Sequence, residues 1–135
     1  MKVLIDTNVI LDVLCDRTPF VDGAAKIFRL CEINRIDGYI SALSVPNIVY
    51  VMRKELDNEK IKDVLEKLSL IFKAVDLKAD DIKKAASLDF NDFEDALQSV
   101  AAKRIKADYI VTRNGKDFSK SQVKAISPTE LLKIV

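Results

Sequence analysis

Short apolar runs alternate with amphipathic stretches along the chain. The runs are rich in Val, Ile and Tyr, which predicts short, buried strands. We expect strands over 2–5, 38–41, 74–77, 108–112 and 122–126. Between them, apolar positions recur at helical spacing. Strands separated by helices are typical of an α/β sandwich with a largely parallel sheet.

The helices are predicted from their apolar faces and their end signals. Asp6, Thr7 and Asn8 can cap a first helix that runs through Leu14, because their side chains accept amide hydrogens. A second helix is expected over 20–35, with Gly38 after its end. Pro46 fits the first turn of a third helix. Further helices are expected over 57–73, 79–88 and 89–107, and from Pro128 onward, while the segment 113–118 is rich in turn residues.

Asp6 directly continues an apolar strand, and this is the first candidate for chemistry. Val3, Leu4 and Ile5 run straight into it. A carboxylate at the end of a buried strand needs partners. In parallel α/β sheets, ligands bind beyond the carboxyl ends of the strands. Asp6 is therefore either a helix cap or part of a ligand site.

Two other segments place polar groups where they can meet Asp6. The stretch from Thr112 to Asp117 follows another strand, and Asp92 and Asp95 lie three residues apart near the start of a helix. If the three places converge, several oxygens surround one hole. Such a cluster of anions repels itself unless a cation neutralises it, and hard oxygen ligands suit Mg²⁺ or Mn²⁺.

The same acids also have ordinary structural explanations. Asn91 or Asp92 can cap the helix, with Asp95 completing a capping box. Asp92 and Glu94 can also be solvated acids favoured by the helix dipole. Asp117 alone is typical of a turn.

Composition narrows the chemistry. With 22 basic and 21 acidic side chains among 135 residues, no overall basic field indicates nucleic-acid binding, so any such site is local. The absence of histidine excludes histidine acid–base cleavage of RNA and the Ser-His and Cys-His nucleophiles. Cys15 and Cys31 are too few for a Cys/His zinc site or a disulfide framework. We expect one domain over 1–135, cytoplasmic and without a membrane span.

Four segments, taken together in the order in which they follow one another, resemble the PIN domain family. Within that family they resemble the VapC-like toxin branch. They are the strand ending in DTNV, the segment ISALS before a helix, the helix DFEDALQ and the stretch IVTRNGKDF. The resemblance covers nearly the whole chain. It implies a PIN-like three-layer sandwich, with a mostly parallel sheet of four or five strands flanked by helices. It also implies a ribonuclease that depends on Mg²⁺ or Mn²⁺.

The resemblance also assigns roles to residues. It implies catalytic roles for Asp6, Asp95 and Asp117, and metal contacts from Asp6, Asp95, Asn114, Asp117, Asn47 and Asp92. The family has a polar or acidic residue in the loop after the fourth strand. Its counterpart here is Asn114 or Asp117, and the choice between them stays open. Thr7, Asn8 and Thr112 would hold the acidic pocket in shape. Arg113 and Lys116 would bind substrate phosphates, or are solvated loop charges.

One position departs from the family pattern. Asn47 stands where the family commonly has Glu, so it offers an amide oxygen without a charge. Asp92 or Glu94 can compensate for the missing carboxylate. The departure also favours an alternative, a non-catalytic PIN-fold module that binds RNA or protein. A receiver domain or a phosphatase similar to the haloacid dehalogenases is disfavoured. Such phosphatases need a second Asp two residues after the first, and this chain has Asn8 at that position.

The toxin-like resemblance implies partners as well. An RNA substrate, a small antitoxin whose tail blocks the acidic pocket and a homodimer are expected. Apolar side chains over 48–72 can supply such surfaces, or they can belong to the core.

Overall fold

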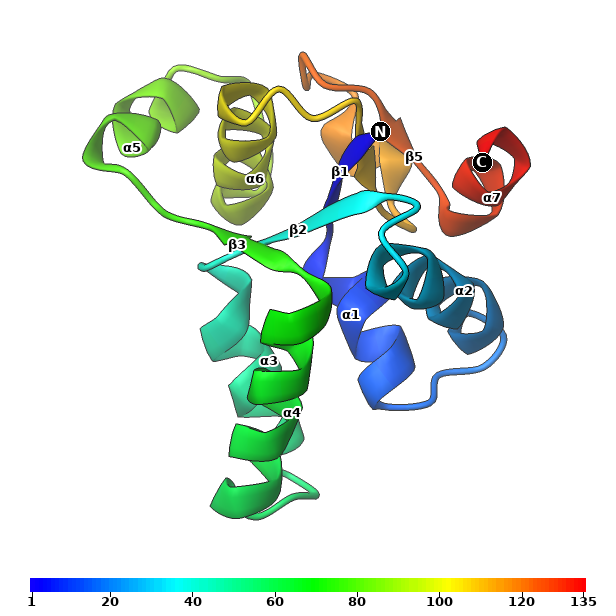
Figure 1. Ribbon diagram of the computed structural model, residues 1–135. Coiled ribbons are helices and arrows are strands. Elements are labelled where there is room, and N and C mark those ends of the chain that lie inside the picture. Colours follow the sequence, from blue (N-terminus) through cyan, green and yellow to red (C-terminus); the bar gives the residue numbers. More distant parts are fainter.

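The computed structural model describes residues 1–135, and its elements alternate as the sequence predicts (Figure 1). In chain order they are β1 (Lys2–Ile5), α1 (Thr7–Leu14), α2 (Val21–Glu32), β2 (Asp37–Ser41), α3 (Ser44–Met52), α4 (Asn58–Ile71), β3 (Lys73–Val75), α5 (Ala79–Ala86), α6 (Phe93–Arg104), β4 (Tyr109–Val111), the 3₁₀ helix η1 (Gly115–Phe118), β5 (Ala125–Ile126) and α7 (Pro128–Ile134).

One five-stranded sheet organises the fold. Its strand order is β3-β2-β1-β4-β5, and every neighbouring pair is parallel. The first strand of the chain therefore lies at the centre. Its last residue, Ile5, pairs with Ile40 of β2 and Val111 of β4. This confirms the predicted α/β fold with a parallel sheet and places three strand ends side by side.

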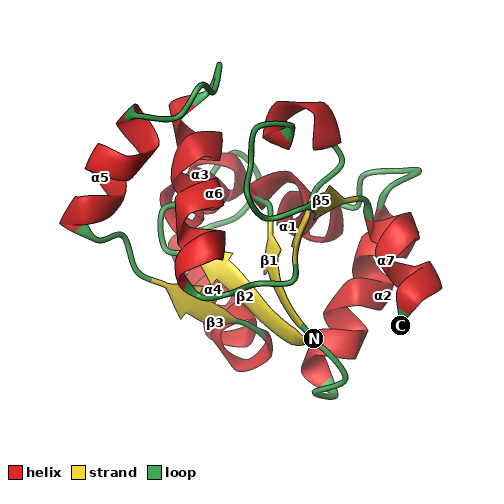
Figure 2. Ribbon diagram, turned by 90° about the horizontal axis from the view of Figure 1, so that it is seen from above, coloured by secondary structure: helices red, strands yellow, loops and turns green.

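Helices cover both faces of this sheet. Val3 and Ile5 pack with the apolar residues of α1, α2, α3, α4 and α7, whereas Leu4 packs with Ala101 and Ala102 of α6. Figure 1 shows α5 and α6 on one side of the sheet and α1, α2, α3 and α4 on the opposite side, and Figure 2 shows α7 beside α2. Burying each large aliphatic side chain contributes about 1.5–3 kcal/mol, so the two clusters fix the helices against the sheet.

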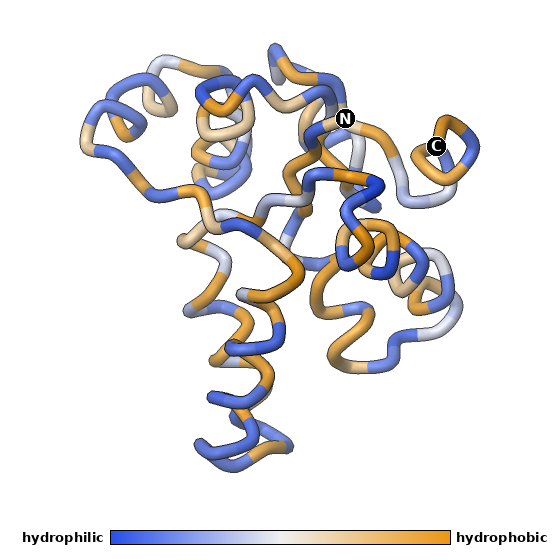
Figure 3. The backbone as a smooth tube through the Cα atoms, in the orientation of Figure 1, coloured by the Kyte–Doolittle hydropathy of each residue, from blue (hydrophilic) through white to orange (hydrophobic).

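Hydropathy follows these layers. Figure 3 shows apolar backbone segments meeting at the sheet, whereas the end of the α3–α4 pair that is farthest from the sheet is hydrophilic. No helix is long and apolar enough to span a membrane.

Cys15 and Cys31 are both free thiols. Burial raises the pKa of the Cys31 thiol to about 12, and the charge of Asp37 adds to this shift.

Several element ends differ from the sequence prediction. The second helix ends at Glu32, not at 35, because Asn34 adopts a left-handed backbone with φ 61°. Gly38 does not mark the helix end. It lies within β2, where a side chain would collide with Cys31 and Phe72.

One further helix and two strands also differ in their ends from the sequence prediction. The helix expected over 89–107 begins at Phe93, because Asp92 caps it, and ends at Arg104, before Lys106 turns left-handed with φ 58°. The strand expected over 74–77 begins one residue earlier and ends at Val75, as β3, and the strand expected over 122–126 shortens to β5. These are the two edge strands, and each is hydrogen-bonded to one neighbour only.

Candidate active site

The ends of β1 and β4 bring Asp6 and Thr112 together. Because Ile5 and Val111 are paired in register, the next residues of the two strands are neighbours. The Asp6 amide donates to the Val111 carbonyl at 2.9 Å. The Thr112 hydroxyl donates to Oδ2 of Asp6 at 2.9 Å, and itself accepts the Asn114 amide hydrogen at 3.0 Å. Thr112 therefore holds Asp6 and the following loop together.

Gln98 of α6 holds the other oxygen of Asp6. Its Nε2 donates to Oδ1 of Asp6 at 3.0 Å, while its own Oε1 is buried without a partner. Asp6 is only 5% exposed. It occupies the N-cap position of α1, yet its side chain makes no capping hydrogen bond. The cap explanation for this side chain is therefore wrong, and the carboxylate is held by two other elements.

The start of α6 supplies three further acids. Asp92 caps the helix by accepting the Asp95 amide hydrogen at 3.1 Å, as the structural explanation of Asp92 predicts. The reciprocal bond of a capping box is not made, so that part of the prediction is wrong. The Asp95 carboxylate lines the adjacent cavity instead, beside Glu94.

Asn47 reaches the same place from α3. The Thr7 hydroxyl donates to the Ser44 hydroxyl at 2.6 Å, which ties the start of α1 to the start of α3 one turn before Asn47. The Nδ2 group of Asn47 donates to Oε2 of Glu94 at 2.9 Å. Asn47, which brings no carboxylate of its own, is thus hydrogen-bonded directly to the Glu94 carboxylate of α6.

All six predicted donor residues line one open cavity of about 330 Å³. It is lined by Asp6, Thr7, Asn8, Leu11, Asn47, Tyr50, Val51, Asp92, Glu94, Asp95, Asn114 and Asp117. Five of these residues carry carboxylates, and none is a lysine or an arginine. Both alternatives for the loop ligand, Asn114 and Asp117, are present. The cavity therefore gathers negative charge without any internal cation to balance it.

Burial and the crowding of acids in the cavity together raise the pKa of two of them, Asp95 and Glu94. The pKa of Asp95 is raised to about 7, first by burial and then by the charges of Asp92, Asp6, Asp117 and Glu94. Burial also raises the pKa of Glu94, and Asp92 and Asp6 add to this shift, while the hydrogen bond from Asn47 opposes it. Keeping all these groups ionised near neutral pH costs free energy that a bound cation would recover.

The raised pKa of Asp95 predicts how stability depends on pH when no divalent ion is present. Between its ordinary value of 3.8 and about 7, the folded chain holds a proton on Asp95 that the unfolded chain has lost. The free energy of unfolding is therefore expected to fall as pH rises through this range. Urea unfolding in EDTA, compared with an Asp95→Asn variant, measures it. Asn at position 95 removes the titrating group, so this part of the pH dependence is lost. Identical pH profiles for the two proteins would contradict the expectation.

Arg113 and Lys116 do not line the cavity. Two of the three guanidinium nitrogens of Arg113, Nε and Nη2, donate to the buried carboxylate of Asp12, at 2.7 and 3.0 Å. The Arg113 guanidinium also lies 4.0 Å from the centre of the Phe20 ring. Lys116 is exposed on η1 and forms no ion pair. Their phosphate-binding role stays a prediction, and for Arg113 it competes with a strong internal partner.

The sequence comparison decides the family. The model of the PIN domain matches residues 2–116. The chain belongs to the PIN domain family. This PIN domain is also 26% identical over 134 residues to Ribonuclease VapC1 of Aquifex aeolicus, a match that spans 96% of this chain and 92% of that protein.

Solved structures show the same fold. The PIN domain superposes on a chain of FitAB bound to an IR36 DNA fragment with a TM-score of 0.71 and 20% identity, covering 93% of this chain and 94% of the other. It superposes on a chain of VapBC2 from Rickettsia felis bound to a promoter DNA fragment with a TM-score of 0.70 and 17% identity, covering 94% and 98%. The PIN-like architecture expected from the sequence is thereby confirmed.

The donor set of this PIN domain fits a hard divalent cation. Five carboxylates and three Asn side chains face one cavity, all oxygen donors and free of competing Lys or Arg. No three acidic or cysteine side chains come close enough together to enclose an ion directly. An ion there would therefore keep part of its hydration shell, as Mg²⁺ usually does in proteins.

Proposed function

We propose that this PIN domain is a metal-dependent endoribonuclease, the toxin of a type II toxin–antitoxin pair. The observation that carries the proposal is the cavity in which five carboxylates meet without a basic residue. The relationship to Ribonuclease VapC1 supports it. Asp6 and Asp95 would be the principal metal contacts, and Asp117, Asn114, Asp92 and Asn47 would complete the set.

The chain's own residues supply rigidity and charge. Thr112 and Gln98 fix the two oxygens of Asp6, so this carboxylate does not need to reorganise during the reaction. Asn8 and Thr7 sit at the amino end of α1, where polar side chains can orient water. A bound Mg²⁺ or Mn²⁺ would lower the pKa of a water molecule and neutralise charge on the phosphate. In the hydrolysis the water oxygen would bond to phosphorus and release a proton to solvent, while the bond from phosphorus to a ribose oxygen would break and that oxygen would take up a proton from solvent.

Cleavage of RNA in the presence and absence of divalent ions tests the proposal. The purified chain is expected to cut RNA with Mg²⁺ or Mn²⁺, to lose this activity in EDTA and to regain it when the metal is added back. Because water is the nucleophile, the products carry linear phosphate ends. Activity that survives EDTA, or products that end in a 2′,3′-cyclic phosphate, would contradict the proposal.

The proposal includes a protein partner. Solved structures similar in fold are a toxin–antitoxin complex from Klebsiella pneumoniae and the DNA-bound VapBC2 complex. We infer that a small antitoxin inhibits this chain by placing a basic side chain among the uncompensated carboxylates of the cavity. A homodimer is proposed in addition.

Asn47 favours a second candidate function. Its amide brings no negative charge, and its Nδ2 is already engaged by Glu94. A chain in which this loss abolished metal binding would be a module that binds RNA or protein without cutting. The cleavage assay separates the two functions. A binding module would leave the RNA intact in the presence of Mn²⁺, although it would still bind RNA or protein.

A further inference from the structure

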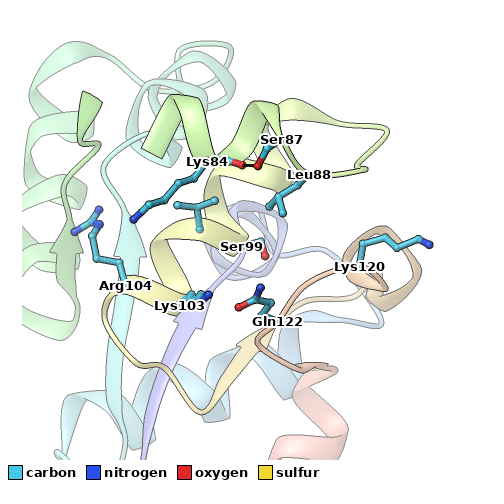
Figure 4. Close-up of a pocket in the computed structure, with 9 residues that line it drawn as sticks. Lys84, Ser87, Leu88, Ser99, Lys103, Arg104, Lys120 and Gln122 are labelled. Carbon is cyan, nitrogen blue, oxygen red and sulfur yellow. Dashed lines mark hydrogen bonds between the residues drawn. The ribbon is translucent and has the colours of Figure 1, made fainter. Parts of the chain in front are cut away.

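A second cavity, of about 410 Å³, lies along the carboxyl half of α6, and its charge is opposite to that of the acidic cavity (Figure 4). It is bounded by α5, α6 and the loop after η1. Lys84, Lys103, Arg104 and Lys120 line it, and no acidic residue does. In a chain whose net charge is +1, this is a local concentration of positive charge.

Only part of this positive charge is neutralised. Arg104 binds both oxygens of the buried Asp81, at 3.2 and 2.9 Å, and also contacts Asp76. Lys84 pairs with Asp80 at 3.1 Å on the surface of α5. Lys103 and Lys120 form no ion pair. The ammonium group of Lys103 is therefore free for an anion from outside. That of Lys120 is also unpaired, at the rim, where Figure 4 shows its side chain extending away from the other lining residues.

The rest of the lining suits a nucleotide better than a simple ion. The Ser87 and Ser99 hydroxyls line the cavity and donate within the chain, to the Lys84 carbonyl and the Ser121 hydroxyl, each at 2.7 Å, so that toward a ligand they can only accept. Gln122 presents a further amide at this edge, and Leu88 and Val100 form an apolar wall. Cations and a hydrogen-bonding amide beside an apolar wall can contact the phosphate and sugar of a nucleic-acid strand.

Both cavities share α6. Asp95 lies in the first turn of this helix and Lys103 in its last turn, eight residues later. At 1.5 Å of rise per residue, the two positions are separated by about 12 Å along the helix axis. This axial separation is short enough for a few nucleotides of a single strand to span.

We propose that the basic cavity binds a backbone phosphate of the single-stranded RNA whose scissile bond lies in the acidic cavity, with Lys103 and Lys120 as the phosphate contacts. The inference rests on the proposed ribonuclease function. It adds a subsite that would make cleavage depend on RNA beyond the reacting nucleotides.

Binding and cleavage by a Lys103→Gln/Lys120→Gln double variant test this subsite. Fluorescence anisotropy in EDTA measures the affinity for a labelled, unstructured RNA oligonucleotide at several salt concentrations. Loss of two phosphate contacts is expected to weaken binding about tenfold and to reduce the slope of log affinity against log salt by about 1.4. With metal present, KM for this oligonucleotide is expected to rise, while cleavage of a dinucleotide stays unchanged.

A Lys60→Gln/Lys62→Gln variant on α4 is the matched control, since it loses the same charge from exposed lysines that form no ion pair. It should retain the affinity and salt dependence of the wild-type chain. Equal RNA affinity in all three proteins would overturn the subsite. Failure of the ribonuclease proposal would look different, because RNA would then stay intact while its binding still depended on Lys103 and Lys120.

Discussion

Asp6→Asn and Asp95→Asn are each expected to lower metal-dependent RNA cleavage by about 10²–10³-fold, the loss typical of removing one preorganised charge contact from an active site. Asp6 is fixed from two sides and Asp95 faces four other acids. Removing either carboxylate takes away charge that no nearby residue replaces in the same orientation. Initial rates with saturating Mn²⁺ measure the effect.

Neither substitution should act by unfolding the chain. Asn at position 6 keeps an oxygen for the Gln98 amide, and at position 95 it relieves repulsion from Asp92 and Asp117. Asp63→Asn is the matched control, because Asp63 carries the same charge on the exposed face of α4. It should cleave like the wild-type chain. If both site variants remained as active as this control, the assignment of the acidic cavity as the active site would be wrong.

Asp12→Ala is expected to cost the largest amount of folding free energy, about 3 kcal/mol, because it breaks a buried ion pair and leaves Arg113 without its partner. Asp12 is fully buried, and both its oxygens bind the Arg113 guanidinium, while Arg17 lies 3.7 Å from Oδ1. In a chain of this size the change corresponds to a decrease in Tm of roughly 10 °C. Thermal unfolding in EDTA measures it.

The contrast with an exposed pair makes this test specific. Asp63 and Lys67 also form an ion pair, at 3.0 Å, but both side chains are more than half exposed. Asp63→Ala should therefore change the free energy of unfolding by at most about 0.5 kcal/mol. Equal losses in the Asp12 and Asp63 variants would show that burial does not set the strength of the Asp12–Arg113 pair.

The sequence predicted the donors of the acidic cavity because strand ends and helix starts are readable local signals. Asp6 follows an apolar run, Asn114 and Asp117 follow another, and Asp95 opens a helix beside an N-cap. A parallel sheet brings such positions to one edge whatever the helices between them do. Asn47 was identified differently, through the resemblance to the PIN domain family, which commonly has Glu at the start of this helix.

Contacts made across the core were not predictable in this way. Gln98 lies in the middle of α6 between Leu97 and Ser99, so nothing local distinguishes it from any buried amide until α6 is packed on β1. The predicted pocket role of Arg113 did not anticipate Asp12, because their pairing joins residues 101 positions apart. Element ends were missed where a single left-handed residue, Asn34 or Lys106, stops a helix whose apolar pattern continues.

Calorimetric titration of the metal-free protein with Mn²⁺ tests the central claim most directly, that separated acids share one divalent ion. The wild-type chain and the Asp63→Asn control are expected to bind Mn²⁺ with the same affinity. In Asp6→Asn and Asp95→Asn the affinity should be at least tenfold lower, a difference of about 1.4 kcal/mol. Undiminished Mn²⁺ binding by both site variants, or no binding by the wild-type chain, would contradict the account.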